Sequence, residues 1–122
     1  MEIIKTEKTI PEKRSDGRGV CLLANYLAEE GRTKIFRVTI PKGTVEKEHM
    51  HKETREIFLF LKPGEIILEG KTYSLDYLDL LIIEKGERHK IIANADMDLI
   101  GMKVDINDKV VTENEELKVL DF

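Results

Sequence analysis

The chain has 122 residues, of which 41% are hydrophobic and 36% are charged, and its formal net charge is −4. This length suits one folded domain, and the composition is typical of a globular protein and not of a disordered one. The acidic balance argues against nucleic acid as the main partner, and the longest apolar runs are too short to cross a bilayer, which excludes a membrane-spanning helix.

Further features of the sequence concern the cellular compartment and the growth temperature to which the protein is suited. The single cysteine, Cys21, excludes an internal disulfide and fits a reducing compartment. Residues 1–8 contain acidic side chains and are not followed by the apolar segment of a signal peptide, so we expect a cytoplasmic protein. The abundance of Glu and Lys and the absence of Gln resemble a hyperthermophile's composition, although an AT-biased genome produces the same bias.

The N-terminal part of the chain has an ambiguous pattern. Residues 14–18 are expected to form a loop, and residues 20–28 fit a strand that pairs with the next one. The apolar residues of 20–28 also recur at helical spacing, with Gly31 as a stop signal. The alternating pattern of the segment that follows favours the strand.

From Thr33 onward the sequence predicts short strands separated by turns. Residues 33–40 alternate, with Phe36, Val38 and Ile40 on one face, and Pro41 and Gly43 end the strand. Further strands are expected over residues 45–51, 56–62, 65–69, 71–75, 79–84, 89–93 and 97–105. Such close spacing without intervening helices predicts an all-β sandwich or barrel.

We therefore expect one domain over residues 1–122. Residues 33–105 form its barrel, residues 1–32 its N-terminal strands and loop, and residues 106–122 a C-terminal tail in which 114–118 fit a turn of helix. Two of the strands, around 57–61 and 80–83, are apolar on both faces. Because a strand of a lone antiparallel barrel should have one polar face, we expect either a homodimer or a cover formed by residues 1–28.

The three histidines of the chain lie where one β topology can bring them together. His49 and His51 leave the same face of a predicted strand, and a four-residue turn then leads to Glu56 on the returning strand. His89 begins a later strand that a closing barrel can bring to the same point. Three imidazoles and one carboxylate suit Fe, Mn, Ni, Co or Zn as a divalent ion, with two open positions if the metal is octahedral. The alternative is a solvated His-x-His pair and an unrelated His89 at a strand end.

A first motif of the cupin superfamily, G-(X)5-H-X-H-(X)3,4-E-(X)6-G, resembles the stretch that begins at Gly43. Five residues separate Gly43 from His49, His51 follows, and Glu56 comes after four more residues. The closing glycine, Gly64, arrives one residue later than the motif asks.

The second cupin motif, G-(X)5-P-X-G-(X)2-H-(X)3-N, is matched less completely. Gly86 and His89 have the motif's spacing, but Leu78 stands at its first glycine, Glu84 at its proline and Ala93 at its asparagine. The departures fall at turns. All four positions that bind metal in the family are filled, so the resemblance implies a metal site of His49, His51, Glu56 and His89.

The resemblance to a small single-domain cupin also implies a fold and a range of activities. It implies a double-stranded β-helix, or jelly-roll barrel, with one divalent transition metal inside and a homodimer as the usual assembly. The same ligand set occurs in oxygenases, decarboxylases and isomerases of the superfamily, so we expect an enzyme of one of these classes acting on a small polar or anionic metabolite. The alternative is a non-catalytic cupin that binds a small molecule or sugar.

Three further residues are candidates for the substrate pocket. Phe58 and Phe60 share a face with Glu56 and could form an apolar wall for substrate, although ordinary core packing is the preferred explanation for them. Lys47 lies two residues before His49 and could bind a carboxylate or phosphate, although a lysine near a strand start often reaches solvent. Beyond the metal ligands, the sequence identifies no catalytic group.

Overall fold

The computed structural model describes residues 1, 3–6, 10–28 and 31–105, except for the side chains of residues 27, 28 and 105. These residues form β-strands and no α-helix, and they contain no helix that is long and apolar enough to span a membrane. The expected C-terminal tail, with its helical turn at 114–118, lies outside the described residues. The strands are β1 (Glu12–Lys13), β2 (Gly19–Ala28), β3 (Gly31–Ile40), β4 (Thr54–Phe60), β5 (Gly64–Leu68), β6 (Lys71–Leu75), β7 (Leu80–Ile83), β8 (His89–Lys90) and β9 (Met97–Asp105).

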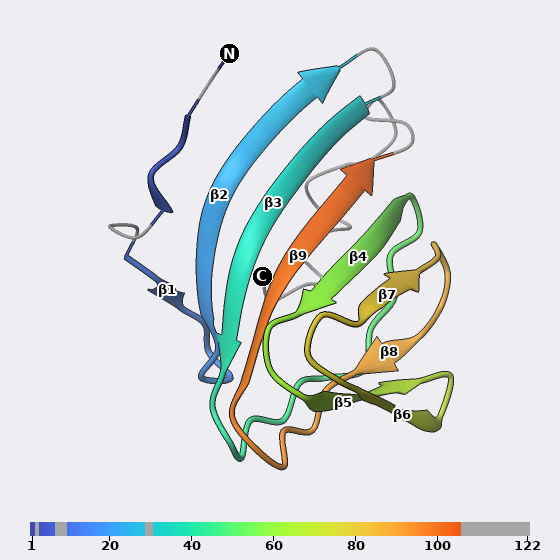
Figure 1. The fold of residues 1–122 in the computed structure, drawn as a ribbon. Coiled ribbons are helices and arrows are strands. Elements are labelled where there is room, and N and C mark those ends of the chain that lie inside the picture. The colour runs from blue at the N-terminus through green and yellow to red at the C-terminus, as the bar shows by residue number, and fades with distance from the viewer. Residues whose placement is uncertain (2, 7–9, 29–30, 106–122) are drawn as a thin grey trace.

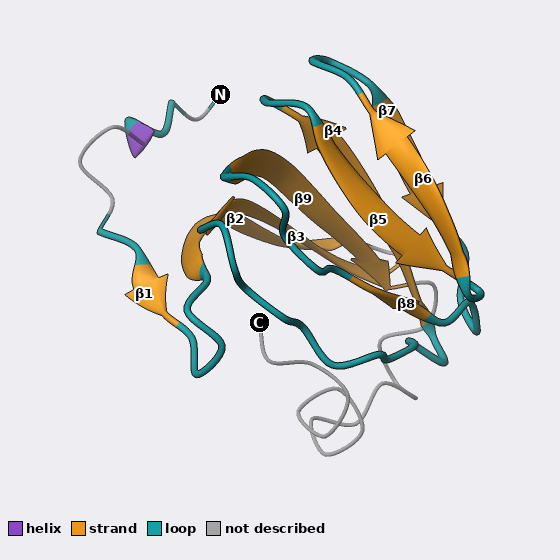
Figure 2. Ribbon diagram, turned by 90° about the horizontal axis from the view of Figure 1, so that it is seen from below, coloured by secondary structure: helices purple, strands orange, loops and turns teal. Residues whose placement is uncertain are grey.

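Two antiparallel sheets face each other (Figures 1 and 2). The larger has the strand order β1-β2-β3-β9-β4-β7, and the smaller has the order β6-β5-β8. Isolated bridges from Val45 to Ile92 and from His49 to His89 attach the segment after β3 to the smaller sheet. The predicted all-β architecture is therefore confirmed.

The core lies between the two sheets and is built from alternate residues of the strands. In β3 these are Phe36, Val38 and Ile40, as the alternating pattern predicted, and Phe58 and Phe60 of β4 lie opposite the smaller sheet in the same cluster. Because alternate residues of a strand point to opposite faces, every second residue of β3, β4 and β9 is directed into the barrel. This inner face continues past the core toward the candidate site.

The strand interpretation of residues 20–28 is confirmed. β2 pairs antiparallel with β3, from Gly19 opposite Thr39 to Ala28 opposite Gly31. The pairing contains one irregularity, between Leu22 and Ala24, which shifts the register by one residue. By pairing along β3, the backbone N–H and C=O groups of β2 form the hydrogen bonds that a helix would have formed within itself.

The expected strand over residues 45–51, and its hairpin with the strand of Glu56, are wrong. Residues 45–49 make only bridges, and they make them with Ile92 and His89. Both edges of β4 are occupied, one by β7 and the other by β9, so no edge of β4 is open to this segment. The predicted strands over 79–84 and 89–93 are shorter than expected, at Leu80–Ile83 and His89–Lys90.

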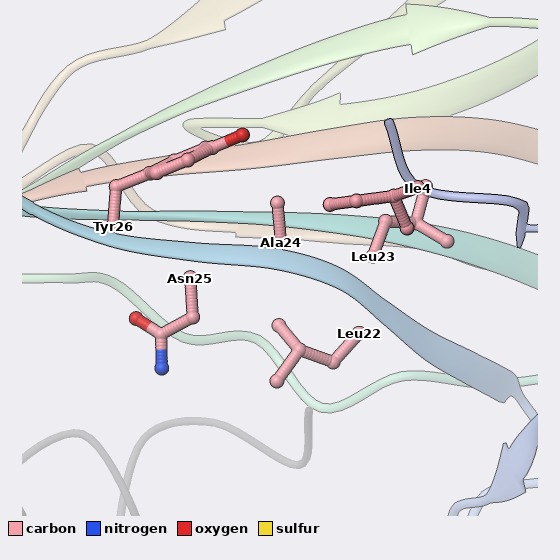
Figure 3. Close-up of a pocket in the computed structure, with 6 residues that line it drawn as sticks. All are labelled: Ile4, Leu22, Leu23, Ala24, Asn25 and Tyr26. Atoms are coloured by element: carbon pink, nitrogen blue, oxygen red, sulfur yellow. The ribbon is translucent and has the colours of Figure 1, made fainter. Parts of the chain in front are cut away.

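The outer face of the larger sheet carries rows of apolar residues across neighbouring strands. In one row Ile35 of β3 lies opposite Met102 of β9, Met102 opposite Ile57 of β4, and Ile57 opposite Ile82 of β7. At the β7 end, Ile82 is 48% exposed. Among the described N-terminal residues, Ile4 lies beside β2 at the other end of the sheet and helps to line a hollow of about 270 Å³ (Figure 3).

Candidate metal centre

Three separate segments supply the four predicted ligands. His49 and His51 come from the segment between β3 and β4, Glu56 from β4 of the larger sheet, and His89 from β8 of the smaller sheet. The main chains of His49 and His89 exchange two hydrogen bonds, of 2.9 and 2.8 Å, which hold these two residues directly opposite each other. The ring centroids of His49 and His89 are consequently 4.3 Å apart.

The carboxylate of Glu56 lies at the centre of the cluster. Its Oε1 is 2.6 Å from Nε2 of His51 and 3.0 Å from Nε2 of His89. One ligand atom from each of the four residues can be chosen so that all four atoms lie within 4.8 Å of one another. The structure therefore brings together all four residues that the sequence predicted as ligands.

Main-chain carbonyl groups orient two of the imidazoles. Nδ1 of His49 is 2.8 Å from the carbonyl oxygen of Lys47, and Nδ1 of His89 is 3.1 Å from that of Glu87. In each case the carbonyl belongs to the residue two positions earlier. A hydrogen bond from Nδ1 to a carbonyl fixes the ring orientation and leaves Nε2 with its lone pair for a metal.

The protonation states of His49 and Glu56 suit metal binding. Burial, together with repulsion from His89, lowers the pKa of His49 to about 4, so this imidazole is neutral near pH 7. Burial opposes ionisation of Glu56, but its short contacts with Nε2 of His51 and Nε2 of His89 outweigh this effect and hold the pKa of the carboxyl below its ordinary value. Neutral imidazoles and an ionised carboxylate are the forms that bind a metal.

Buried polar atoms that lack hydrogen-bond partners indicate whether a metal fits these four residues. Nε2 of His49 and Oε2 of Glu56 are both buried and make no hydrogen bond within the described part of the chain. The four side chains are at most 6% exposed, so solvent contributes little to satisfying them. A divalent metal bound by three imidazoles and one carboxylate satisfies both atoms, so the cluster fits such an ion, whose identity is open.

A second buried cluster, which the sequence analysis missed, lies beside the first. Arg18 is 1% exposed and donates hydrogen bonds to Asp16, at 2.7 Å from Nε, and to Glu46, at 2.8 Å from Nη1. Oε1 of Glu46 is directed toward the metal ligands, 3.9 Å from Nδ1 of His49. Burial raises the pKa of Glu46 to about 7, against the opposing effect of Arg18.

The three candidate pocket residues have different surroundings. Phe58 and Phe60 are 2% and 0% exposed and belong to the core cluster, which agrees with the core-packing alternative. The side chain of Lys47 is exposed, while its carbonyl group orients His49. The structure thus gives Lys47 a main-chain contact with the site.

The turns of the two motifs keep the backbone geometry that glycine favours. Gly43 and Gly86 have φ angles of 92° and 85°, in the left-handed region. Leu78, which stands where the second motif has a glycine, also has a positive φ, of 68°. The chain therefore adopts the motif's turn with a residue for which that conformation costs about 1–2 kcal/mol.

Comparison with known proteins identifies the fold. No protein-family model matches the chain, and no curated protein matches it in sequence. Among solved structures, KdgF from a Halomonas species matches with a TM-score of 0.75 and 17% identity, over 90% of this chain and 100% of that one. An RmlC-like cupin from Shewanella frigidimarina matches with a TM-score of 0.72 and 15% identity, over 91% and 97%.

A third solved structure is described as a predicted oxalate decarboxylase from Thermotoga maritima. It matches with a TM-score of 0.71 and 18% identity, over 85% of this chain and 99% of that one. These likenesses confirm that the protein has the cupin fold, a jelly-roll barrel, as the motifs at Gly43 and Gly86 implied.

Proposed function

We propose that the protein is a small metal-dependent enzyme in which His49, His51, Glu56 and His89 hold one divalent transition metal and a small polar or anionic metabolite binds to that metal. The observation that carries the proposal is the set of buried, converging ligand atoms, two of which have no partner within the described residues. A purely structural polar cluster in a barrel would be expected to satisfy its own atoms.

The charge of the site favours an anionic ligand. A divalent ion, one carboxylate and three neutral imidazoles give a net charge of about +1. When bound, the metal supplies a Lewis acid and a template for a bidentate ligand such as a hydroxy acid or keto acid. This chemistry fits an oxygenase, a decarboxylase or an isomerase, and the likeness to the T. maritima protein adds support for the decarboxylase class.

Within this site the chain's own groups have distinct tasks. The carbonyl groups of Lys47 and Glu87 fix the rings of His49 and His89, so the ligand atoms are positioned before a metal arrives. Burial of the four side chains excludes water and strengthens the electrostatic interactions of the site. The alternative function is a non-catalytic cupin that holds a small molecule or sugar, and open metal positions favour the enzyme over it.

Metal content tests the site. We expect purified protein without a histidine tag to contain about one equivalent of a divalent transition metal, and the His51→Ala variant to lose it. The matched control is Lys47→Ala on the same segment, whose side chain is exposed and whose carbonyl contact remains. Wild-type protein without metal after anaerobic reconstitution, or equal metal in His51→Ala, would contradict the proposal.

Turnover separates the enzyme from the binding protein. Metal-loaded protein is mixed with a panel of hydroxy and keto acids, and oxygen uptake, carbon dioxide release and isomer formation are measured. We expect one of these products to form with the wild type and not with the metal-free His51→Ala variant. Tight binding of panel members without any conversion would favour the binding protein.

We also propose that the outer apolar face of the larger sheet joins two copies of the chain in a homodimer. The apolar row that crosses β3, β9, β4 and β7 ends in Ile82, and a shorter apolar row across β9, β4 and β7 ends in Leu80. These two residues are 48% and 58% exposed. Burying such a face against its own copy removes apolar area from water.

Light scattering should give the mass of a dimer for the wild type and of a monomer for Ile82→Glu, with the exposed Lys71→Glu as control. A monomeric wild type would contradict the interface.

A cytoplasmic location is proposed on the single, buried Cys21, which suits a reducing compartment. Detection of the native protein in a membrane or extracellular fraction of its cells would contradict it.

A further inference from the structure

Glu46 lies inside the barrel, on the segment between β3 and β4 that also carries His49. Its main-chain N–H donates a hydrogen bond of 2.8 Å to the carbonyl group of Ile91. Its neighbour Val45 is 63% exposed, whereas Glu46 is 4% exposed, so the two side chains take opposite sides of the segment. Ile91 and His89 are two residues apart and are both buried, as expected of residues on one inner face. Glu46 is therefore placed beside the metal ligands.

The two carboxylate oxygens of Glu46 differ in their contacts. Nη1 of Arg18 donates a hydrogen bond of 2.8 Å to Oε2, and this ion pair holds the carboxylate in place. Oε1 is buried and makes no hydrogen bond within the described part of the chain. It lies 3.9 Å from Nδ1 of His49, which is too long for a hydrogen bond. A buried carboxylate oxygen without a donor is costly, so Oε1 needs a partner from outside the chain.

Glu46 also interacts electrostatically with two other predicted ligands. Burial is the main cause of its raised pKa, Arg18 opposes it, and smaller effects come from His89 and Glu56. Interactions between charges weaken with distance, so effects of this kind indicate that both residues lie near Glu46. Together with the contact to His49, they place the Glu46 carboxylate next to the candidate metal centre as a whole.

Other donors inside the barrel are engaged elsewhere. Arg18 binds Asp16 as well as Oε2 of Glu46. Nδ1 of His49 faces the carbonyl oxygen of Lys47, at 2.8 Å. Lys103 of β9 is 8% exposed and lies directly opposite Glu56, so a carboxylate already adjoins its charge. None of these groups supplies the hydrogen that Oε1 of Glu46 lacks.

We infer that Oε1 of Glu46 accepts a hydrogen bond from a hydroxyl group of the molecule that occupies the metal. This inference rests on the proposed function and narrows its ligands from hydroxy and keto acids to hydroxy acids. An ionised carboxylate can only accept hydrogen bonds, whereas a hydroxyl group can bind a metal through its oxygen and still donate its hydrogen. A hydrogen bond to an ionised acceptor is also stronger than one between neutral groups.

The same contact disfavours a keto acid. A carbonyl oxygen in place of the hydroxyl group brings two acceptors together and leaves Oε1 unpartnered and buried. A site that pairs with a hydroxyl group discriminates strongly against an analogue that lacks it, because the buried group of the protein then stays unsatisfied. Glu46 is in this way a specificity residue for the metal-bound molecule.

Lactate and pyruvate test the inference, because they share a carbon skeleton and a chelating pair of oxygen atoms. Calorimetry on the Mn(II)-loaded protein gives the ratio of lactate affinity to pyruvate affinity, with the tighter-binding lactate enantiomer. The assay is run at about pH 8, above the pKa of about 7 of Glu46, so that its carboxylate is ionised. We expect the ratio for the wild type to exceed that for aqueous Mn(II) by at least about 10-fold.

Substitutions locate that preference at Glu46. In Glu46→Gln the amide oxygen can still accept from Arg18, which turns the amide N–H₂ toward the site, and a donor there favours pyruvate. The affinity ratio should therefore fall at least about 10-fold, while metal content stays at the wild-type value. The matched control is Glu48→Gln, the same change at an exposed position two residues along the segment, and it should leave the ratio within about 2-fold of the wild type.

The outcomes separate this inference from the proposed function. A metal-loaded wild type that binds neither acid, that shows only the preference of aqueous Mn(II), or whose ratio survives Glu46→Gln would overturn the role of Glu46 and leave the metal site standing. A wild type that binds no metal would overturn the proposed function and the inference with it. If Glu46→Gln does not fold, the comparison of the wild type with aqueous Mn(II) and the Glu46→Met variant, whose ratio should fall toward that of the aqueous ion, still decide the matter.

Discussion

Two buried polar clusters lie side by side in this barrel, and they differ in how their charges are satisfied. In the cluster of Asp16, Arg18 and Glu46, a guanidinium group lies between two carboxylates, and hydrogen bonds connect all three. In the cluster around Glu56, three imidazoles surround one carboxylate. There, ligand atoms remain without hydrogen bonds within the described residues.

The difference indicates which cluster serves the fold and which serves a ligand. When a buried charge has ion-pair and hydrogen-bond partners within the protein, those partners offset the cost of removing it from water. Converging buried atoms without such partners instead need a ligand to satisfy them. Glu46 belongs to both descriptions, because Oε2 binds Arg18, whereas Oε1 faces His49 and makes no hydrogen bond within the described residues. Perturbing each cluster separately should therefore change different properties.

The largest expected effect is on stability and comes from Arg18. Arg18→Met leaves Asp16 and Glu46 buried without their counter-charge, and we expect a loss of about 3–5 kcal/mol in the free energy of unfolding. Urea denaturation of the metal-free protein measures it. The metal stoichiometry should stay at the wild-type value, because no ligand has changed.

The double variant Arg18→Met/Glu46→Gln is the control for this prediction. Removing the stranded charge of Glu46 should recover part of the lost stability. A single variant within about 1 kcal/mol of the wild type would contradict the structural role of Arg18.

An intermediate effect is expected in the pH dependence of stability. Because the pKa of Glu46 is raised in the folded state, to about 7 from 4.5, its contribution is fully present below pH 4.5 and is lost as the pH rises through 7. Metal-free wild type should therefore lose up to about 3 kcal/mol relative to Glu46→Gln across this range.

The contribution of His49 has the opposite sign. Its pKa is lowered to about 4, so stability from this residue is lost as the pH falls from 6.5 through 4. Both proteins contain His49, so the difference between their unfolding curves isolates Glu46. A difference that stays constant from pH 4.5 to 7 would contradict the raised pKa.

The smallest effect is expected from an ion pair in contact with water. Nη2 of Arg37 is 2.7 Å from Oδ2 of Asp98, and the Arg37 side chain is 51% exposed. Arg37→Ala should change the free energy of unfolding by less than about 1 kcal/mol, since solvent screens this pair. Urea denaturation at low and high salt gives the value, and a loss as large as that of Arg18→Met would contradict the role assigned to burial.

The sequence allowed the four metal ligands to be predicted, but not the strand pairing that brings them together. His49, His51, Glu56 and His89 were identified from residue types and motif spacing, both of which are local. The expected hairpin to Glu56 was wrong because β9, the last of the described strands, pairs with one edge of β4, and β7 pairs with the other. Alternation shows which face a residue takes, and it does not show which strand is the neighbour.

The inner charges were missed for different reasons. Arg18 follows a loop, where no periodicity indicates the direction of a side chain. For Lys103 a signal existed, because it continues the alternation of Met97 and Leu99 along β9 and therefore had to point inward.

The carbonyl groups that orient His49 and His89 belong to the main chain of Lys47 and Glu87. Every amino acid carries the same carbonyl, so replacement of either side chain leaves the hydrogen bond in place. The surface charge at position 47 is thus free to change, in nature or by engineering, to suit a different ligand or a different solvent, whereas the carboxylate of Glu87 also accepts a hydrogen bond of 2.7 Å from the main-chain N–H of Glu84. The orientation of the His49 and His89 rings therefore depends on main-chain groups, whereas the charge of the exposed side chain at position 47 can change without disturbing them.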